Sequence, residues 1–367
     1  MPPKHWSASE RITAFKEKKG FRDNLELHTY FNQRLSKIVT GHGRQMVGWD
    51  EILHPGLPKD TVVHSWRGQE SLGAAVKQGF RGILSFGYYL DLIWPAAEHY
   101  AVDPFDKGVD RLLEADRARV LGGEACLWSE YVTPETLDSR LWPRTAAIAE
   151  RLWSPREVKD VADMYLRLDA ASRWLEWLGL DHQAGYGRML ERLAGREADD
   201  LRALADVVEP VKNYEREDTH EYTTSTPLNR LVDVTRPESE AARSLGRAVD
   251  TMLADPAHQA GREAIRARLR DWRDLGVGLR SLLEGRALLR ELVPLAIEAS
   301  ALAGAGLEAL GFLEQGQFAP DSWWKERAAL LQRPKSPPHG LEVAFRPAVG
   351  KLVEAARGAT ASTAGSR

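Results

Sequence analysis

Cysteine is almost absent from this chain of 367 residues, which has a single one, Cys126. One thiol forms no internal disulfide, and no second cysteine stands near it to complete a thiolate metal site. Because Cys126 lies in an apolar segment expected to be a strand, we interpret it as a buried, unreactive thiol. The histidines show none of the spacings typical of metal ligands. The sequence therefore predicts no metal and no cofactor.

Strong net charge and long hydrophobic runs are also lacking. The formal net charge is −3, too small to attract nucleic acid or an anionic membrane surface. No stretch approaches the roughly 18 consecutive apolar residues of a membrane helix. The N-terminal residues lack a charged region followed by an apolar run, so we expect no signal peptide. These absences predict no nucleic-acid or membrane partner, and they leave the compartment open.

Tryptophan, by contrast, is abundant. The chain has 12, and seven of them precede residue 154. An indole covers the apolar face of a pyranose, and a neighbouring carboxylate accepts hydrogen bonds from its hydroxyls. The concentration of indoles in the first half of the chain therefore indicates carbohydrate chemistry there.

Strand and helix patterns alternate in this half. Short apolar segments at 45–49, 61–66, 82–86 and 120–127 are separated by helical patterns, and a longer helix is expected over about 9–42. Such alternation predicts parallel βα units. Each expected strand ends near an aromatic residue, and in a (β/α)₈ barrel that carboxyl edge carries the active site. Only about four units fit, so the predicted fold is α/β: the C-terminal half of a (β/α)₈ TIM barrel, followed by an α-helical region.

Four regions are expected along the chain. Residues 1–190 would form the partial TIM barrel with its catalytic site, and 191–240 a helix and polar linker. Residues 241–355 would form amphipathic helices, because apolar positions recur at helical spacing with charges on the other face. The tail at 356–367 is rich in Ala, Gly, Ser and Thr, a composition typical of disorder.

Four sequence blocks carry a more specific signal. They are Val-Gly-Trp-Asp-Glu-Ile-Leu at 47–53, Trp-Arg-Gly at 66–68, Gly-Tyr-Tyr-Leu-Asp-Leu at 87–92, and Leu-Gly-Gly-Glu-Ala-Cys-Leu-Trp-Ser-Glu-Tyr at 121–131 with its continuation to Ser154. In these blocks and their order, the chain resembles the family 20 glycoside hydrolases, the β-N-acetylhexosaminidases, over about residues 1–190. The resemblance implies hydrolysis of terminal non-reducing N-acetylhexosamine (GlcNAc or GalNAc) from glycans.

The resemblance also implies roles for six residues. An indole box around the N-acetyl group would be formed by Trp49, Trp66 and Trp128. The tyrosine that hydrogen-bonds the acetamide oxygen would be Tyr89, and the carboxylates that hold sugar hydroxyls would be Asp91 and Glu130.

Structural interpretations of the same residues stay open. The tryptophans are also suited to a core, Tyr88 is an alternative to Tyr89, and Asp91 is suited to capping a loop. Glu130 is also suited to pairing with Arg140 or Arg144. These arginines, with Pro143, Glu150 and Arg151, are interpreted as residues that attach the following helix.

The family's reaction is substrate-assisted: the acetamide oxygen attacks the anomeric carbon, with retention. Its acid belongs to an adjacent Asp-Glu pair within a His-x-Gly-Gly-Asp-Glu motif, which is absent here. Aligning Lys4-His-Trp6 with the family places Met1 directly after that motif, so we expect a start called too late. Asp50-Glu51 is another adjacent acidic pair, and we expect it to have solvated or supporting roles.

Three hypotheses follow. The chain is the C-terminal part of a hexosaminidase, an inactive sugar-binding or relic fragment, or a carrier for a helical interaction module near 240–330. A half barrel exposes strand edges and apolar surface, so we also expect a homodimer or aggregation.

Overall fold

A parallel sheet of four strands forms the centre of the first half of the chain. The structure, a computed structural model, describes residues 4–255 and 259–358. The strands are β1 (Val47–Trp49), β2 (Val62–Ser65), β3 (Arg81–Leu84) and β4 (Val120–Gly123), in the order β1-β2-β3-β4 with every neighbouring pair parallel. The predicted α/β character is confirmed. All four strands are shorter than the apolar segments suggested.

α-Helices connect β2 to β3 and β3 to β4, as is usual for parallel strands, whereas a short 3-10 turn (Asp50–Ile52) and a loop connect β1 to β2. The helix α3 (Gln69–Lys77) joins β2 to β3 and packs on both. A Cβ atom at Gly82 of β3 would lie 2.4 Å from Leu72 Cδ1 of α3, so a larger residue would fit here only if the Leu72 side chain moved. Between β3 and β4 lie α4 (Ala96–Tyr100) and α5 (Glu114–Arg117), and β4 is followed by α6 (Leu137–Leu141), α7 (Arg144–Trp153) and α8 (Val161–Trp177).

The N-terminal helical region is two helices, where the sequence suggested one. The helix α1 (Glu10–Lys19) ends at Gly20, which adopts a left-handed conformation with φ of 72°. The helix α2 (Asn24–Gly41) begins after Asp23, whose side chain accepts a hydrogen bond from the Glu26 N–H at 2.9 Å. A left-handed glycine and an aspartate cap end one helix and start the next, and local periodicity does not detect such a break.

The chain divides into two units of dense internal contacts. Unit 1 comprises the described residues up to Leu90, then Ala96–Trp128 and Thr145–Arg167. Unit 2 comprises Asp91–Pro95, Ser129–Arg144 and the described residues from Leu168 onward. The domain boundaries expected at 190, 240 and 355 stay predictions.

Unit 2 is mainly helical and has its own apolar core. Its further elements are α9 (Ala184–Ala194), α10 (Ala198–Ala205), β5 (Val208–Pro210), α11 (Leu231–Val234), α12 (Glu240–Ala254), α13 (Gln259–Arg273), α14 (Leu275–Gly278), α15 (Arg280–Gly285), α16 (Val293–Glu314), α17 (Asp321–Leu331), β6 (Leu341–Val343) and α18 (Arg346–Arg357). The strands β5 and β6 pair antiparallel. The segment expected as a helix and linker, 191–240, thus also contains a strand of this unit.

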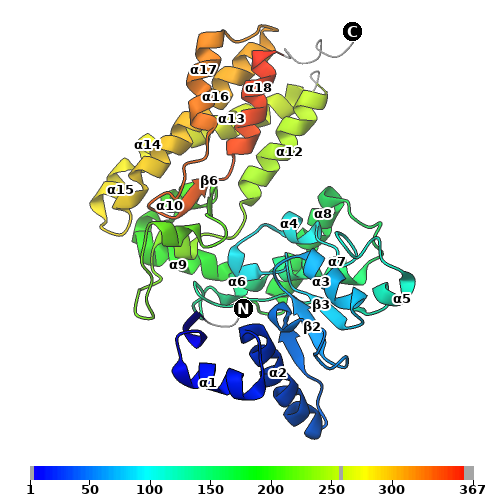
Figure 1. The fold of residues 1–367 in the computed structure, drawn as a ribbon. Coiled ribbons are helices and arrows are strands. Elements are labelled where there is room, and N and C mark those ends of the chain that lie inside the picture. Colours follow the sequence, from blue (N-terminus) through cyan, green and yellow to red (C-terminus); the bar gives the residue numbers. More distant parts are fainter. Residues whose placement is uncertain (1–3, 256–258, 359–367) are drawn as a thin grey trace. The chain divides into compact units, whose positions relative to one another are not determined.

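The helix α16 lies at the centre of unit 2. It packs against α13, α14, α17 and α18 (Figure 1). Its buried positions, which include Leu295, Leu302 and Leu310, lie on one broad face of the helix. The other face also carries an apolar residue, Ile297, which is 56% exposed, so the helix is less amphipathic than the sequence suggested. By length and composition alone, the segment Arg290–Glu314 is also apolar enough to cross a membrane, and half of its most apolar window is buried in the structure. A central core helix has the same composition.

The C-terminal tail was expected to be disordered over 356–367. Its first residues complete α18, which ends at Arg357. Residues 359–367 lie outside the part of the chain that the structure describes.

Candidate active site

Two of the three expected box indoles meet beside the sheet. Trp49 ends β1, and its register partner on β2 is His64. Neighbours in register point to the same side of a sheet, and the Trp49 and His64 rings stack with centroids 4.3 Å apart. The Trp128 ring lies 5.7 Å from that of Trp49, inclined by 44°. Trp128 is 53% exposed, so its indole remains accessible to a ligand.

The third indole, Trp66, follows directly after β2. Its Nε1 donates to both carboxylate oxygens of Glu51, at 3.1 and 3.0 Å. Trp66 is 39% exposed. Glu51 therefore orients an expected box residue, which is a supporting role.

Asp50, the other member of the adjacent acidic pair, is 3% exposed. Its carboxylate accepts hydrogen bonds from Arg67 Nε at 2.7 Å and from Ser71 Oγ at 2.7 Å. A carboxylate so paired links β1 to the start of α3. Asp50 is thus buried and has a supporting role. The expectation that it is solvated is wrong, and the alternative expectation of a supporting role agrees with its contacts.

The two adjacent tyrosines differ in their surroundings. Tyr88 is fully buried, and its hydroxyl donates to the Val102 carbonyl oxygen at 2.9 Å. Burial, first among its causes, raises the pKa of the Tyr88 hydroxyl well above its usual range. Tyr89 is half-buried, and its hydroxyl lies 3.4 Å from Ser85 Oγ. Tyr88 is a core residue, and of the two only Tyr89 keeps exposed surface.

Small residues behind the site allow close packing. A Cβ atom at Gly123, the last residue of β4, would lie 2.6 Å from Tyr88 Cε2 and 2.9 Å from Leu152 Cδ2. The missing side chain of Gly123 therefore lets the Tyr88 ring pack against the end of β4, whereas a Cβ atom at Gly122 would meet nothing within 4 Å.

In unit 2, both expected hydroxyl-binding carboxylates interact with Tyr214. The Tyr214 hydroxyl donates to Asp91 Oδ2. Burial, followed by the hydrogen bond to Asp91, raises the pKa of Tyr214 far above its usual range, and the charge of the nearby Glu130 also raises the pKa of that hydroxyl. The other Asp91 oxygen, Oδ1, is buried and has no partner among the described residues. An unsatisfied buried acceptor of this kind is available to a hydroxyl donor.

Sequence reasoning missed Tyr214, because this residue lies in the region 191–240 that is expected to be a helix and polar linker. Asn213 and Tyr214 both have left-handed backbones, with φ of 53° and 62°. Such conformations are uncommon outside glycine and cluster at functional sites. The Trp94 Nε1 donates to Asn213 Oδ1 at 3.0 Å. Trp94 lies three residues after Asp91, so this hydrogen bond attaches the turn at Asn213 and Tyr214 to the segment that contains Asp91.

Arg140 of α6 and Arg144, the first residue of α7, both form structural hydrogen bonds. Arg140 is buried and donates to the carbonyl oxygens of Thr235 at 2.8 Å and Asp233 at 2.7 Å. Arg144 donates to the Trp94 carbonyl oxygen at 2.8 Å. Burial lowers the pKa of Arg140 to about 10 and that of Arg144 to about 9.

Three potential metal ligands, which sequence analysis did not link to one another, lie close together near Trp49. His64, Glu124 and Cys126 place one potential ligand atom each within 4.8 Å of the others. Burial lowers the pKa of His64 below its usual value. Cys126 is half-buried, so the prediction of a buried thiol is wrong.

Comparison with known proteins identifies the segment that holds the sheet. Residues 1–156 match the model of the glycosyl hydrolase family 20 catalytic domain. This segment belongs to glycosyl hydrolase family 20. The family resemblance read from the sequence blocks is thereby confirmed.

Individual relatives agree with this assignment. The chain is 36% identical over 176 residues to the β-hexosaminidase subunit alpha of Rattus norvegicus, which covers 44% of this chain and 32% of that protein. It is 36% identical over 200 residues to a β-hexosaminidase of Porphyromonas gingivalis, covering 49% and 25%. The crystal structure of a Flavobacterium johnsoniae chitobiase aligns with a TM-score of 0.85 and 35% identity, over 95% of this chain and 54% of that one.

The chain spans about a third or less of these curated relatives and about half of the chitobiase chain. The structural likeness extends over unit 2, whereas the family 20 model ends at residue 156. The helical region is therefore shared with at least one solved family 20 structure.

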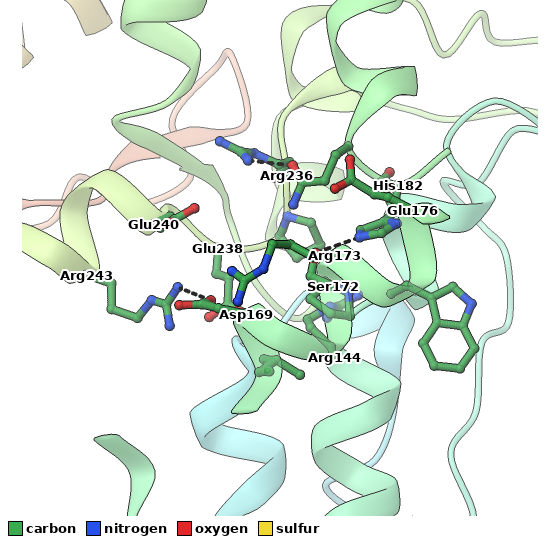
Figure 2. Close-up of a pocket in the computed structure, with 16 residues that line it drawn as sticks. Arg144, Asp169, Ser172, Arg173, Glu176, His182, Arg236, Glu238, Glu240 and Arg243 are labelled. Atoms are coloured by element: carbon green, nitrogen blue, oxygen red, sulfur yellow. Dashed lines mark hydrogen bonds and ion pairs between the residues drawn. The ribbon is translucent and has the colours of Figure 1, made fainter. Parts of the chain in front are cut away.

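A separate pocket lies wholly within unit 2 and contains none of the expected sugar-site residues (Figure 2). Its volume is about 260 Å³. Four arginines (Arg144, Arg173, Arg236, Arg243) face four carboxylates (Asp169, Glu176, Glu238, Glu240) in its lining. Arg243 pairs with Asp169 at 3.5 Å, and Ser172 Oγ lies 2.7 Å from His182 Nε2. Because the charges balance, the lining selects neither an anion nor a cation.

Proposed function

We propose that this chain supplies sugar-binding residues of a β-N-acetylhexosaminidase that removes terminal non-reducing GlcNAc or GalNAc. The observation that carries the proposal is the meeting of Trp49 and Trp128, with ring centroids 5.7 Å apart, within the segment that matches family 20. The matched relatives are named β-hexosaminidases and a chitobiase, which agrees with this substrate class.

In the proposed reaction, the indoles of Trp49, Trp66 and Trp128 enclose the acetamide and exclude water from it. The Tyr89 hydroxyl donates to the acetamide oxygen and holds it near the anomeric carbon. That oxygen attacks the anomeric carbon as the leaving group departs, giving an oxazolinium ion, and water then opens this ion with net retention. Holding the acetamide oxygen close to the anomeric carbon, in the orientation for attack, contributes much of the rate acceleration.

Asp91 and Glu130 are proposed to accept hydrogen bonds from sugar hydroxyls. The unsatisfied Asp91 Oδ1 supports this role, because a buried acceptor without a donor is costly unless a ligand provides one. Tyr214 is proposed to position Asp91 through the hydrogen bond of its hydroxyl, which also interacts electrostatically with Glu130.

The leaving group needs an acid, and we propose that this chain does not contain it. The 367 residues include no Gly-Gly-Asp-Glu sequence. Asp50 is committed to Arg67 and Ser71, and Glu51 to Trp66. The parallel order β1-β2-β3-β4, without a further strand in the described part of unit 1, supports the proposal of half a (β/α)₈ barrel. Its open edges at β1 and β4 would favour a homodimer.

Binding and turnover of the purified chain test the proposal separately. We expect calorimetry to detect GlcNAc binding that Trp128→Ala weakens tenfold or more, or about 1.4 kcal/mol. The control Trp153→Ala, at a site 92% exposed, should bind as the unchanged chain does. We expect no hydrolysis of a chromogenic GlcNAc glycoside. Absence of GlcNAc binding would contradict the sugar site, and robust hydrolysis would contradict the missing acid.

The alternative function is an inactive sugar-binding or relic fragment, which the absence of the acid motif favours. Reading the genomic DNA upstream of the Met1 codon distinguishes the two. A continuing frame that encodes Gly-Gly-Asp-Glu would support the enzyme, and an immediate in-frame stop codon would support the fragment.

A further inference from the structure

Three potential metal ligands from separate parts of the sequence converge in unit 1. One imidazole nitrogen of His64, one carboxylate oxygen of Glu124 and the sulfur of Cys126 all lie within 4.8 Å of one another. His64 belongs to β2, whereas Glu124 and Cys126 follow β4, with β3 between them. In parallel barrels, side chains from alternate strands form common layers. Because β2 and β4 are alternate strands of the sheet, His64 on β2 and the two residues after β4 can lie in one such layer.

Backbone pairing fixes the segment that carries two of them. The Glu124 N–H donates to the Leu84 carbonyl oxygen at 2.8 Å, and the Cys126 N–H donates to the Tyr88 carbonyl oxygen at 3.0 Å. Residues two apart in an extended segment point to the same side. Glu124 and Cys126 therefore present their side chains together, on a backbone held by the neighbouring strand.

We propose that His64, Glu124 and Cys126 bind one Zn²⁺ ion beside the indole box. Imidazole nitrogen, thiolate sulfur and carboxylate oxygen are the three ligand types that zinc uses in proteins. With zinc–ligand bonds of about 2.0–2.3 Å, tetrahedral ligand atoms stand about 3.5 Å apart. The fourth position is open to water.

Two features support a bound metal ion at this site and favour zinc over Mg²⁺ and Ca²⁺. His64 is 6% exposed, and its Nε2 is buried without a partner among the described residues. A buried nitrogen without a partner is rare in folded proteins unless a ligand satisfies it. The thiol and the imidazole disfavour Mg²⁺ and Ca²⁺, which prefer oxygen ligands.

Titration with Co²⁺ in place of zinc tests the site, with any affinity tag removed first. Thiolate coordination gives Co²⁺ an intense charge-transfer absorption, and Cys126 is the chain's only cysteine. We expect this absorption to saturate at one equivalent, to be displaced by Zn²⁺, and to vanish in Cys126→Ser. We expect His64→Gln and Glu124→Gln each to weaken Zn²⁺ binding by tenfold or more, measured against a chromophoric chelator.

The control is His42→Ala, which removes an exposed histidine at the end of α2 and should leave zinc binding unchanged. Circular dichroism without metal identifies variants that have not folded. Trp49 fluorescence, isolated by comparison with Trp49→Phe, gives a second readout because Trp49 stacks on His64. Absence of the charge-transfer absorption in the unchanged chain, or equal zinc affinity in Cys126→Ser, would overturn the proposal.

Discussion

The hydroxyl of Tyr214 donates a hydrogen bond to the carboxylate of Asp91, 123 positions earlier in the chain. The Glu130 carboxylate is a charged neighbour of the same hydroxyl. Tyr214 thus orients one of the two carboxylates that are proposed to hold the sugar and interacts with the other. Its left-handed backbone, next to that of Asn213, gives the loop the conformation that this arrangement requires.

Replacement Tyr214→Phe should destabilise the protein by about 1–3 kcal/mol, because it leaves Asp91 with a second unsatisfied oxygen. Urea denaturation followed by tryptophan fluorescence measures this change. Tyr30→Phe is the matched control, since Tyr30 lies in an aromatic cluster with Phe15 and Phe21. Equal stability of the Tyr214 and Tyr30 variants would show that the hydrogen bond to Asp91 contributes nothing.

Arg140→Met should be more damaging, by about 3–5 kcal/mol. The change removes two charged hydrogen bonds and leaves the buried carbonyl oxygens of Asp233 and Thr235 unsatisfied. The midpoint of thermal unfolding should therefore fall sharply. Arg188→Met, which loses an exposed ion pair with Asp181, should cost at most about 1 kcal/mol. Similar losses in the two variants would contradict a structural role for Arg140.

Stability should fall as the pH drops below about 6.5, partly because of His339. This side chain is buried, and its Nδ1 accepts a hydrogen bond from the Leu341 N–H at 3.2 Å. Burial lowers the pKa of His339 below its unfolded value, so the folded state binds fewer protons. Its contribution is present above the unfolded pKa and is lost as the pH falls toward the folded pKa.

His339→Asn keeps an acceptor and removes the titration, so its stability should vary less with pH. The limiting difference in slope is about 1.4 kcal/mol per pH unit. Urea unfolding between about pH 8 and 5 measures both slopes. His42→Asn, at an exposed site, should behave as the unchanged chain does. Identical slopes for the unchanged chain and His339→Asn would rule out this linkage.

Asp50→Asn tests whether the adjacent acidic pair has a catalytic role. Because Asp50 is buried with Arg67 and Ser71, we expect a stability loss of about 1–3 kcal/mol and unchanged GlcNAc affinity. Glu51→Gln should have a smaller effect on stability, since Glu51 is half-buried. If the unchanged chain hydrolyses a GlcNAc glycoside and either variant abolishes turnover, the supporting role assigned here is wrong.

The sequence by itself determined the family and the α/β order. Trp49, Trp66 and Trp128 stand in short sequence blocks whose residues and order can be recognised without knowing the tertiary structure. It also separated strands from helices, since their hydrophobic periods differ. It did not detect the break at Gly20, which depends on a single backbone conformation.

Only the tertiary structure brought Tyr214 to Asp91 and His64 to Cys126, because these contacts join segments far apart in sequence. It also decided that Tyr88 is a core residue, since adjacent tyrosines look alike until one side chain is buried. Local propensity acts over a few residues, whereas burial and hydrogen-bond partners are set by the packing of the whole unit.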